Sequence, residues 1–208
     1  MRWLDALQVL DSAFPTGAFA HSLGLESLTP ADLGSALALR LNESVARLEL
    51  VFLLHAYTVE LLELDALMHA SLLVREPREA SSFTGTSFLR AVCELLVDPR
   101  LSSFLDEGQH HHHAVVFGAV CGALEVPPGQ AAEWYALNTL RSQVSAAQRL
   151  GWIGQREAQR ILHQLKPVVK DAAASAARVT LEDAGAFSPL WDIASMRHER
   201  APARMFNS

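Results

Sequence analysis

Residues 35–57 read SALALRLNESVARLELVFLLHAY, and this stretch decides the fold. Its apolar side chains recur at steps of three to five residues, with charged residues between them; they are Leu37, Leu41, Val45, Leu48, Phe52 and Tyr57. Because an α-helix repeats every 3.6 residues, this spacing places them on one face. The stretch therefore predicts a long amphipathic helix whose apolar face is buried.

The same spacing continues along most of the chain. Further helices are predicted over residues 77 or 78 to 97, 115–124, 130–150, 155–177 with a kink at Pro167, and 188–199. Residues 101–113 form the most irregular stretch, after a stop at Asp98-Pro99. No alternating strand pattern longer than a few residues and no internal repeat occurs. The expected fold is all-α, a single-domain helical bundle of roughly eight to ten helices over residues 1–208.

The composition of the chain excludes some classes of protein. The chain has 208 residues, 50% of them hydrophobic and 19% charged, with a net charge of −6. This composition fits one packed domain and excludes global disorder. The absence of a basic surplus argues against a nucleic-acid partner.

The sequence favours a cytoplasmic protein. Two isolated cysteines, Cys93 and Cys121, offer no disulfide framework and fit a reducing compartment. Asp5 interrupts the beginning of the chain, where a signal peptide needs an unbroken apolar run. The longest apolar runs are shorter than the roughly 20 residues needed to cross a bilayer. We therefore expect no membrane partner.

The loop over residues 11–26 is the most unusual segment. Pro15 and Gly17 predict a turn between two helices, which is the simplest interpretation of the loop. A hydrolytic set of Asp11, His21 and Glu26 is the alternative. No nucleophile with a recognisable elbow or oxyanion loop accompanies these residues, which disfavours catalysis.

Four histidines follow one another from His110 to His113. Imidazole binds nickel, copper and zinc well, and His110 and His113 have the spacing to pair on a helix. A solvated loop before a helix N-terminus is the simpler interpretation. His198 and Glu199 lack a second histidine four residues away and are interpreted as a polar helix end.

A row of arginines surrounds the turn at Gly151. A solvated helix face is its usual meaning, and a partner-binding surface is the alternative. The row comprises Arg141, Arg149, Arg156 and Arg160.

Residues 7–26, LQVLDSAFPTGAFAHSLGLE, closely resemble the opening signature of the urease accessory protein UreF family: a Pro-x-Gly turn, an aromatic residue, a Ser or His pair and Gly-Leu-Glu. Three further segments match in the same order along nearly the whole chain. They are residues 78–85, with the pattern Arg-x-x-Ser-x-x-x-Gly; residues 149–159, with Gly-Gln and a following Gln; and residues 192–208.

The resemblance implies a non-enzymatic factor in the insertion of nickel into apo-urease. Such a protein binds UreD, called UreH in some systems, and recruits and regulates the nickel-binding GTPase UreG. It forms a homodimer within the complex, which docks on apo-urease. It holds no cofactor of its own, because the complex handles the nickel. A metallochaperone that uses His110–His113 remains the alternative.

The resemblance also indicates where partners bind. Phe19 and Arg204 match positions in regions implicated in dimer formation and UreG recruitment, and residues 191–208 match a segment that orders on UreD. The expected partner-binding residues are Phe19, His21, Glu26, Arg197, His198, Glu199, Arg204 and Phe206. No catalytic residue and no metal ligand is implied, His110 and His113 being the only metal candidates.

Overall fold

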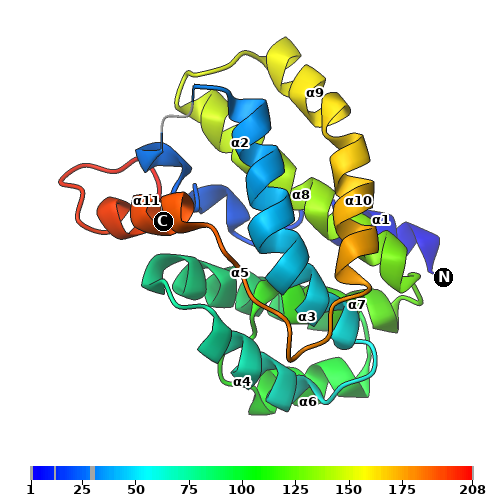
Figure 1. The fold of residues 1–208 in the computed structure, drawn as a ribbon. Helices are drawn as coiled ribbons and strands as arrows, with labels where there is room; N and C mark the ends of the chain where they lie inside the picture. Colours follow the sequence, from blue (N-terminus) through cyan, green and yellow to red (C-terminus); the bar gives the residue numbers. More distant parts are fainter. Residues whose placement is uncertain (1, 12, 29–30, 208) are drawn as a thin grey trace.

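A computed structural model describes residues 2–11, 13–28 and 31–207. Ser12 of the opening signature and Ser208 of the C-terminal segment lie outside this range. The described residues form helices and no strand, which confirms the all-α fold (Figure 1). The α-helices are α1 (Trp3–Val9), α2 (Leu33–Arg40), α3 (Leu50–His55), α4 (Leu61–Ser71), α5 (Arg75–Cys93), α6 (Pro99–Glu107), α7 (His113–Ala123), α8 (Pro128–Arg149), α9 (Gln155–Gln164), α10 (Lys166–Ala176) and α11 (Pro189–His198).

The predicted helix over residues 35–57 is the central element. It consists of α2, a π-helical segment η3 (Leu41–Glu49) and α3, which follow one another without a break. The first five of its predicted apolar residues, from Leu37 to Phe52, are buried. Tyr57 lies just beyond α3 and donates a hydrogen bond to the Val126 carbonyl at 2.9 Å. The apolar spacing thus identified the element on which the others pack.

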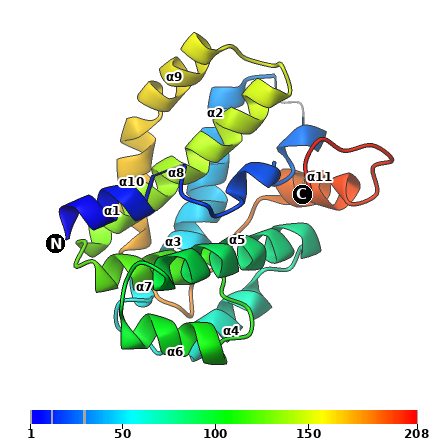
Figure 2. The same ribbon diagram turned by 180° about the vertical axis from the view of Figure 1, so that it is seen from behind.

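The core lies where α3, α7 and α8 meet. Four consecutive residues of α3, from Leu50 to Leu53, are buried, and so are eight consecutive residues of α7, from Ala114 to Cys121. Figures 1 and 2 show α9 and α10 on one side of this centre, with α4, α5 and α6 at its lower end. Helices buried on all sides in this way carry no polar face, which explains their nearly continuous apolar sequence.

The expectation of irregular structure over residues 101–113 is wrong for its first half. Helix α6 occupies residues 99–107, and Asp98 begins it instead of ending a segment. The Asp98 carboxylate accepts hydrogen bonds from the backbone N–H groups of Arg100 at 2.9 Å and Leu101 at 3.0 Å. Pro99 fills the first helical position, where a missing N–H costs nothing.

Proline divides the helix predicted over residues 155–177, as expected. The chain forms α9 and α10 with Leu165 between them, and Pro167 lies in the first turn of α10. This division and the unexpected α6 bring the α-helices of the described residues to eleven. Among the same residues, no helix combines the length and apolarity that a membrane crossing requires.

Candidate functional site

The loop that precedes η2 (Leu25–Ser27) packs tightly on α11. Gly24 has a φ of 86°, in the left-handed region that favours glycine. A Cβ at this position would lie 2.5 Å from Ser195 Oγ and 3.2 Å from the Trp191 carbonyl oxygen. Gly24 therefore allows both the turn and the close approach that bring Glu26 beside α11.

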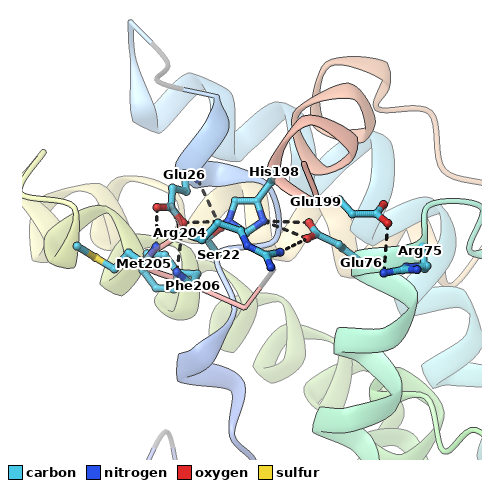
Figure 3. A network of polar contacts seen from close by, with 9 residues as sticks. All are labelled: Ser22, Glu26, Arg75, Glu76, His198, Glu199, Arg204, Met205 and Phe206. Carbon is cyan, nitrogen blue, oxygen red and sulfur yellow. Dashed lines mark hydrogen bonds and ion pairs between the residues drawn. The ribbon is translucent and has the colours of Figure 1, made fainter. Parts of the chain in front are cut away.

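His198, at the end of α11, lies fully buried between two carboxylates (Figure 3). Its Nε2 atom is 3.0 Å from Glu26 Oε2, and its Nδ1 atom is 3.0 Å from Oε2 of Glu76 on α5. Each ring nitrogen is thus within hydrogen-bond distance of one carboxylate. Through these two contacts, His198 joins the N-terminal loop, α5 and α11.

The same two carboxylates hold the end of the chain. Glu26 accepts hydrogen bonds from the backbone N–H groups of Met205 at 2.9 Å and Phe206 at 3.2 Å. Arg204 Nη1 lies 3.2 Å from Glu76 Oε1. Glu26, Glu76, His198, Arg204 and the backbone of residues 205–206 are called the C-terminal latch below (Figure 3).

The latch favours the ionised form of Glu26. Partial burial acts to raise the pKa of this carboxyl group, but hydrogen bonds from Met205, His198 and Phe206 outweigh it and leave the pKa below its ordinary value. The carboxylate therefore stays charged at neutral pH, as its contacts with His198 and two backbone N–H groups require.

Apolar and aromatic contacts reinforce the latch on either side. The Phe206 ring is almost fully buried, and the Arg149 guanidinium lies 4.2 Å from its centroid. On α11, the Trp191 ring lies 4.6 Å from the guanidinium of Arg40. Both geometries fit cation–π contacts. Arg149, predicted as part of a solvated or partner-binding row, thus contacts the chain's own C-terminal segment.

The structure brings together most of the predicted site residues. Glu26, His198, Arg204 and Phe206 lie in or against the latch, and Glu199 beside it pairs with Arg75 at 3.2 Å. The remaining three lie outside these contacts. Phe19 is 73% exposed on η1 (Ala18–Ala20), the His21 ring packs edge-on against Phe83, and Arg197 is exposed on α11.

Glu76 is the central residue that sequence reasoning missed. It occupies the first turn of α5, next to Pro77, where an acid is ordinarily read as an exposed helix start. Its side chain is instead buried against His198, 122 residues away. No local pattern marks Glu76, because the residues that bury it are distant in the sequence.

The exposed side of α11 mixes large apolar and charged side chains. Trp191, Ala194, Ser195 and His198 face the bundle and are buried. The exposed side carries Leu190, Ile193 and Met196, together with Asp192 and Arg197. A cluster of exposed large apolar side chains on one short helix is typical of a protein-binding surface.

The interpretation of His110–His113 as a solvated loop is wrong, although the run does precede a helix N-terminus. His111 and His112 are buried. The cause is Asp65 on α4, whose carboxylate accepts the backbone N–H groups of His111 at 2.8 Å and His112 at 2.7 Å. A contact across 46 residues thus folds the run inward.

The proposed helical pair of His110 and His113 does not form. His110 precedes α7 and stacks on the ring of His69, whereas His113 packs against Phe117 and Tyr135. Within residues 2–11, 13–28 and 31–207, no group of three or more candidate ligands is arranged to hold a metal ion.

The hydrolytic alternative also finds no assembled site. Asp11 accepts a hydrogen bond from the Ala13 backbone at 2.7 Å, and Glu26 binds His198. His21 lies against Phe83. The three residues thus contact different groups.

Buried histidines make the fold sensitive to acid. Burial and the neighbouring histidines lower the pKa of His112 to about 3, and burial lowers that of His113 to about 4. In the unfolded chain these side chains titrate near 6.5, so the unfolded state binds more protons below that pH. Between pH 7 and pH 5, we expect the protonation of His112 in the unfolded state alone to lower the free energy of unfolding by about 2 kcal/mol. Urea denaturation at the two pH values measures this change. The variant His113→Phe should lose less stability over this pH range than the native protein. An equal loss would show that the buried His113 does not contribute to the acid sensitivity.

A cavity of about 960 Å³ lies between the N-terminal segment, α5, α8 and α9. Its lining combines charged, polar and apolar side chains. It includes Glu49 and Tyr135, joined by a 2.6 Å hydrogen bond, together with His113 and His163.

The similarity to known proteins extends over nearly the whole chain. A family model described as UreF matches residues 28–166, from the end of η2 to the start of α10. The chain is 35% identical to the urease accessory protein UreF of Arthrobacter sp. strain FB24, covering 97% of this chain and 95% of that protein. It is 29% identical to the urease accessory protein UreF of Bacillus sp. strain TB-90, covering 100% and 99%. It is also 30% identical to the urease accessory protein F of Arabidopsis thaliana, covering 100% and 93%.

Proposed function

The chain belongs to the UreF family of urease accessory proteins, and on this basis we propose that it is a non-catalytic scaffold for the insertion of nickel into apo-urease. It binds UreD (UreH), recruits and regulates the GTPase UreG, and works as a homodimer in a complex that docks on apo-urease. Nickel is the cargo of this complex and not a cofactor of the chain.

The C-terminal latch is the observation that carries the proposal. It commits the ionisable groups of Glu26, Glu76 and His198 to contacts within the chain. By holding α11 on the bundle, it also presents the apolar side chains of Ile193 and Met196 outward. A helix that is already folded and exposes large apolar side chains suits protein docking, because little conformational entropy is lost on binding. We assign this face, within residues 191–208, to UreD.

Phe19 is assigned to the recruitment of UreG. It is exposed on η1, next to the end of the chain, where the Asn207 N–H donates a hydrogen bond to the Ala20 carbonyl at 2.8 Å. Exposed aromatic side chains are frequent anchors in interfaces. The contact between Asn207 and Ala20 would let UreD binding on α11 affect the presentation of Phe19.

Two further features support the proposal. The mixed lining of the large cavity, with Glu49 and His113, offers oxygen and imidazole groups suited to a passing nickel ion. The free thiols of Cys93 and Cys121 suit a reducing compartment, and we place the complex in the cytoplasm.

Co-purification with UreD and UreG tests the two surfaces. We expect Ile193→Asp to abolish co-elution with UreD, because a charge would be buried in the apolar interface. Phe19→Ala should retain UreD and lose UreG. Both variants should keep the helical circular dichroism of the native protein, since both side chains are exposed.

Lys170→Asp provides a matched control, since it introduces the same acid on the exposed side of α10. It should leave both partners bound. Retention of UreD by Ile193→Asp would remove α11 from the docking surface, and retention of UreG by Phe19→Ala would remove η1.

A further inference from the structure

Three imidazoles from two distant segments meet near the N-terminus of α7. His69 on α4 has its Nδ1 atom 3.1 Å from His112 Nε2. On its other side, the His69 ring stacks on His110 with 3.6 Å between centroids. The C-terminal latch is built from other residues, so this cluster is unexplained by the proposed docking function.

The surroundings of His112 direct its Nε2 atom at His69. Ser81 Oγ on α5 accepts the His113 backbone N–H at 3.2 Å and lies 3.2 Å from His112 Nδ1. It can therefore accept a hydrogen bond from an N–H group at Nδ1, which fixes the orientation of the ring. With the proton there, Nε2 directs a lone pair at His69. A second ring nitrogen held by a neighbouring oxygen is the usual support of a metal-binding histidine.

The distance between the two nitrogens fits a pair of adjacent metal ligands. Imidazole nitrogens bind divalent ions of this class at about 2.0–2.1 Å. Two such ligands at right angles, as in octahedral or square-planar coordination, are about 3 Å apart. His69 Nδ1 and His112 Nε2 already have this separation. An ion that replaces the proton they share would lie to one side of the line that joins the two nitrogens, so both rings must tilt toward it. His69 then carries its proton on Nε2, and no net proton is released.

We propose that His69 and His112 together bind one divalent cation of the nickel, copper and zinc class. Because no set of three or more ligands converges in the described residues, water completes the coordination and the ion exchanges readily. Asp65, which holds the backbone of residues 110–112, adds a nearby negative charge, and Arg78 adds an opposing positive one. The inference does not rest on the proposed function, because it requires no other urease protein.

Titration calorimetry of the full chain without an affinity tag, with Ni²⁺ as the probe, tests the site. We expect one ion per chain, and at least a tenfold weaker affinity for His69→Ala. His69 is partly exposed, so this variant should remain folded. Ser81→Ala should weaken binding by about tenfold, because the orientation of His112 is lost. His163→Ala, an exposed histidine on α9, should bind like the native chain.

Spectroscopy gives a second readout. With Cu²⁺ as the probe, electron paramagnetic resonance should show coupling to two imidazole nitrogens, and to one after His69→Ala. Equal Ni²⁺ affinity of His69→Ala and the native chain would overturn the site. Loss of binding in His163→Ala would also overturn it, by placing the ion on α9.

Discussion

Replacing Glu76 with alanine should release the end of the chain from the bundle. The substitution leaves the buried ring of His198 with one carboxylate and removes the partner of Arg204. A buried polar group left without its hydrogen-bond partner costs about 1–3 kcal/mol. We expect this loss to appear as local opening of residues 199–207, since Arg204 loses its partner and His198, where α11 ends, loses one of its two. Hydrogen exchange at the Met205 and Phe206 amides should rise strongly, and proteases should cleave there.

Glu79→Ala is the matched control for this experiment. Glu79 lies one turn further along α5 and pairs with Arg75 at 3.5 Å on the surface. An exposed pair contributes about 0–1 kcal/mol, so the control should leave exchange in the tail unchanged. Equal protection of Met205 and Phe206 in Glu76→Ala and in the native protein would show that the latch does not hold the tail.

Local periodicity explains which parts of the fold were predictable. The helical run from Leu37 to Phe52 was found because its burial depends on spacing alone. Helix α6 was missed because Asp98-Pro99 suits both the end of one helix and the beginning of the next. Local sequence does not distinguish the two, and the choice depends on what packs afterwards.

Long-range contacts explain what was missed at the polar sites. The resemblance of the chain's two ends to a known family suggested Glu26 and His198, but not Glu76, the second carboxylate that contacts His198, which looks like any exposed acid. Likewise, four histidines in a row suggest a solvated loop until Asp65 binds their backbone. These contacts join residues that are 45 or more positions apart in the sequence, and the spacing of apolar residues does not predict them.

The contact between α5 and the histidine run also determines where the fold should be least tolerant of change. Gly85 lies inside α5, against the backbone of residues 111–113. A Cβ there would overlap the carbonyl oxygen of His111 and lie 2.7 Å from the His113 nitrogen. Both atoms belong to the main chain, which Asp65 and Ser81 hold in place, so neither can rotate away.

Gly85→Ala should therefore destabilise the protein by about 3 kcal/mol or more, as overpacking against fixed atoms does. Alanine is the better helix former by about 1 kcal/mol, and this gain is too small to offset the overlap. Urea denaturation would measure the difference. Gly129→Ala on α8 is the control, since no heavy atom lies within 4 Å of its Cβ. It should be neutral or stabilising by up to about 1 kcal/mol. If Gly85→Ala proved as stable as Gly129→Ala, α5 and the histidine run would not be in the close contact on which the burial of His111 and His112 depends.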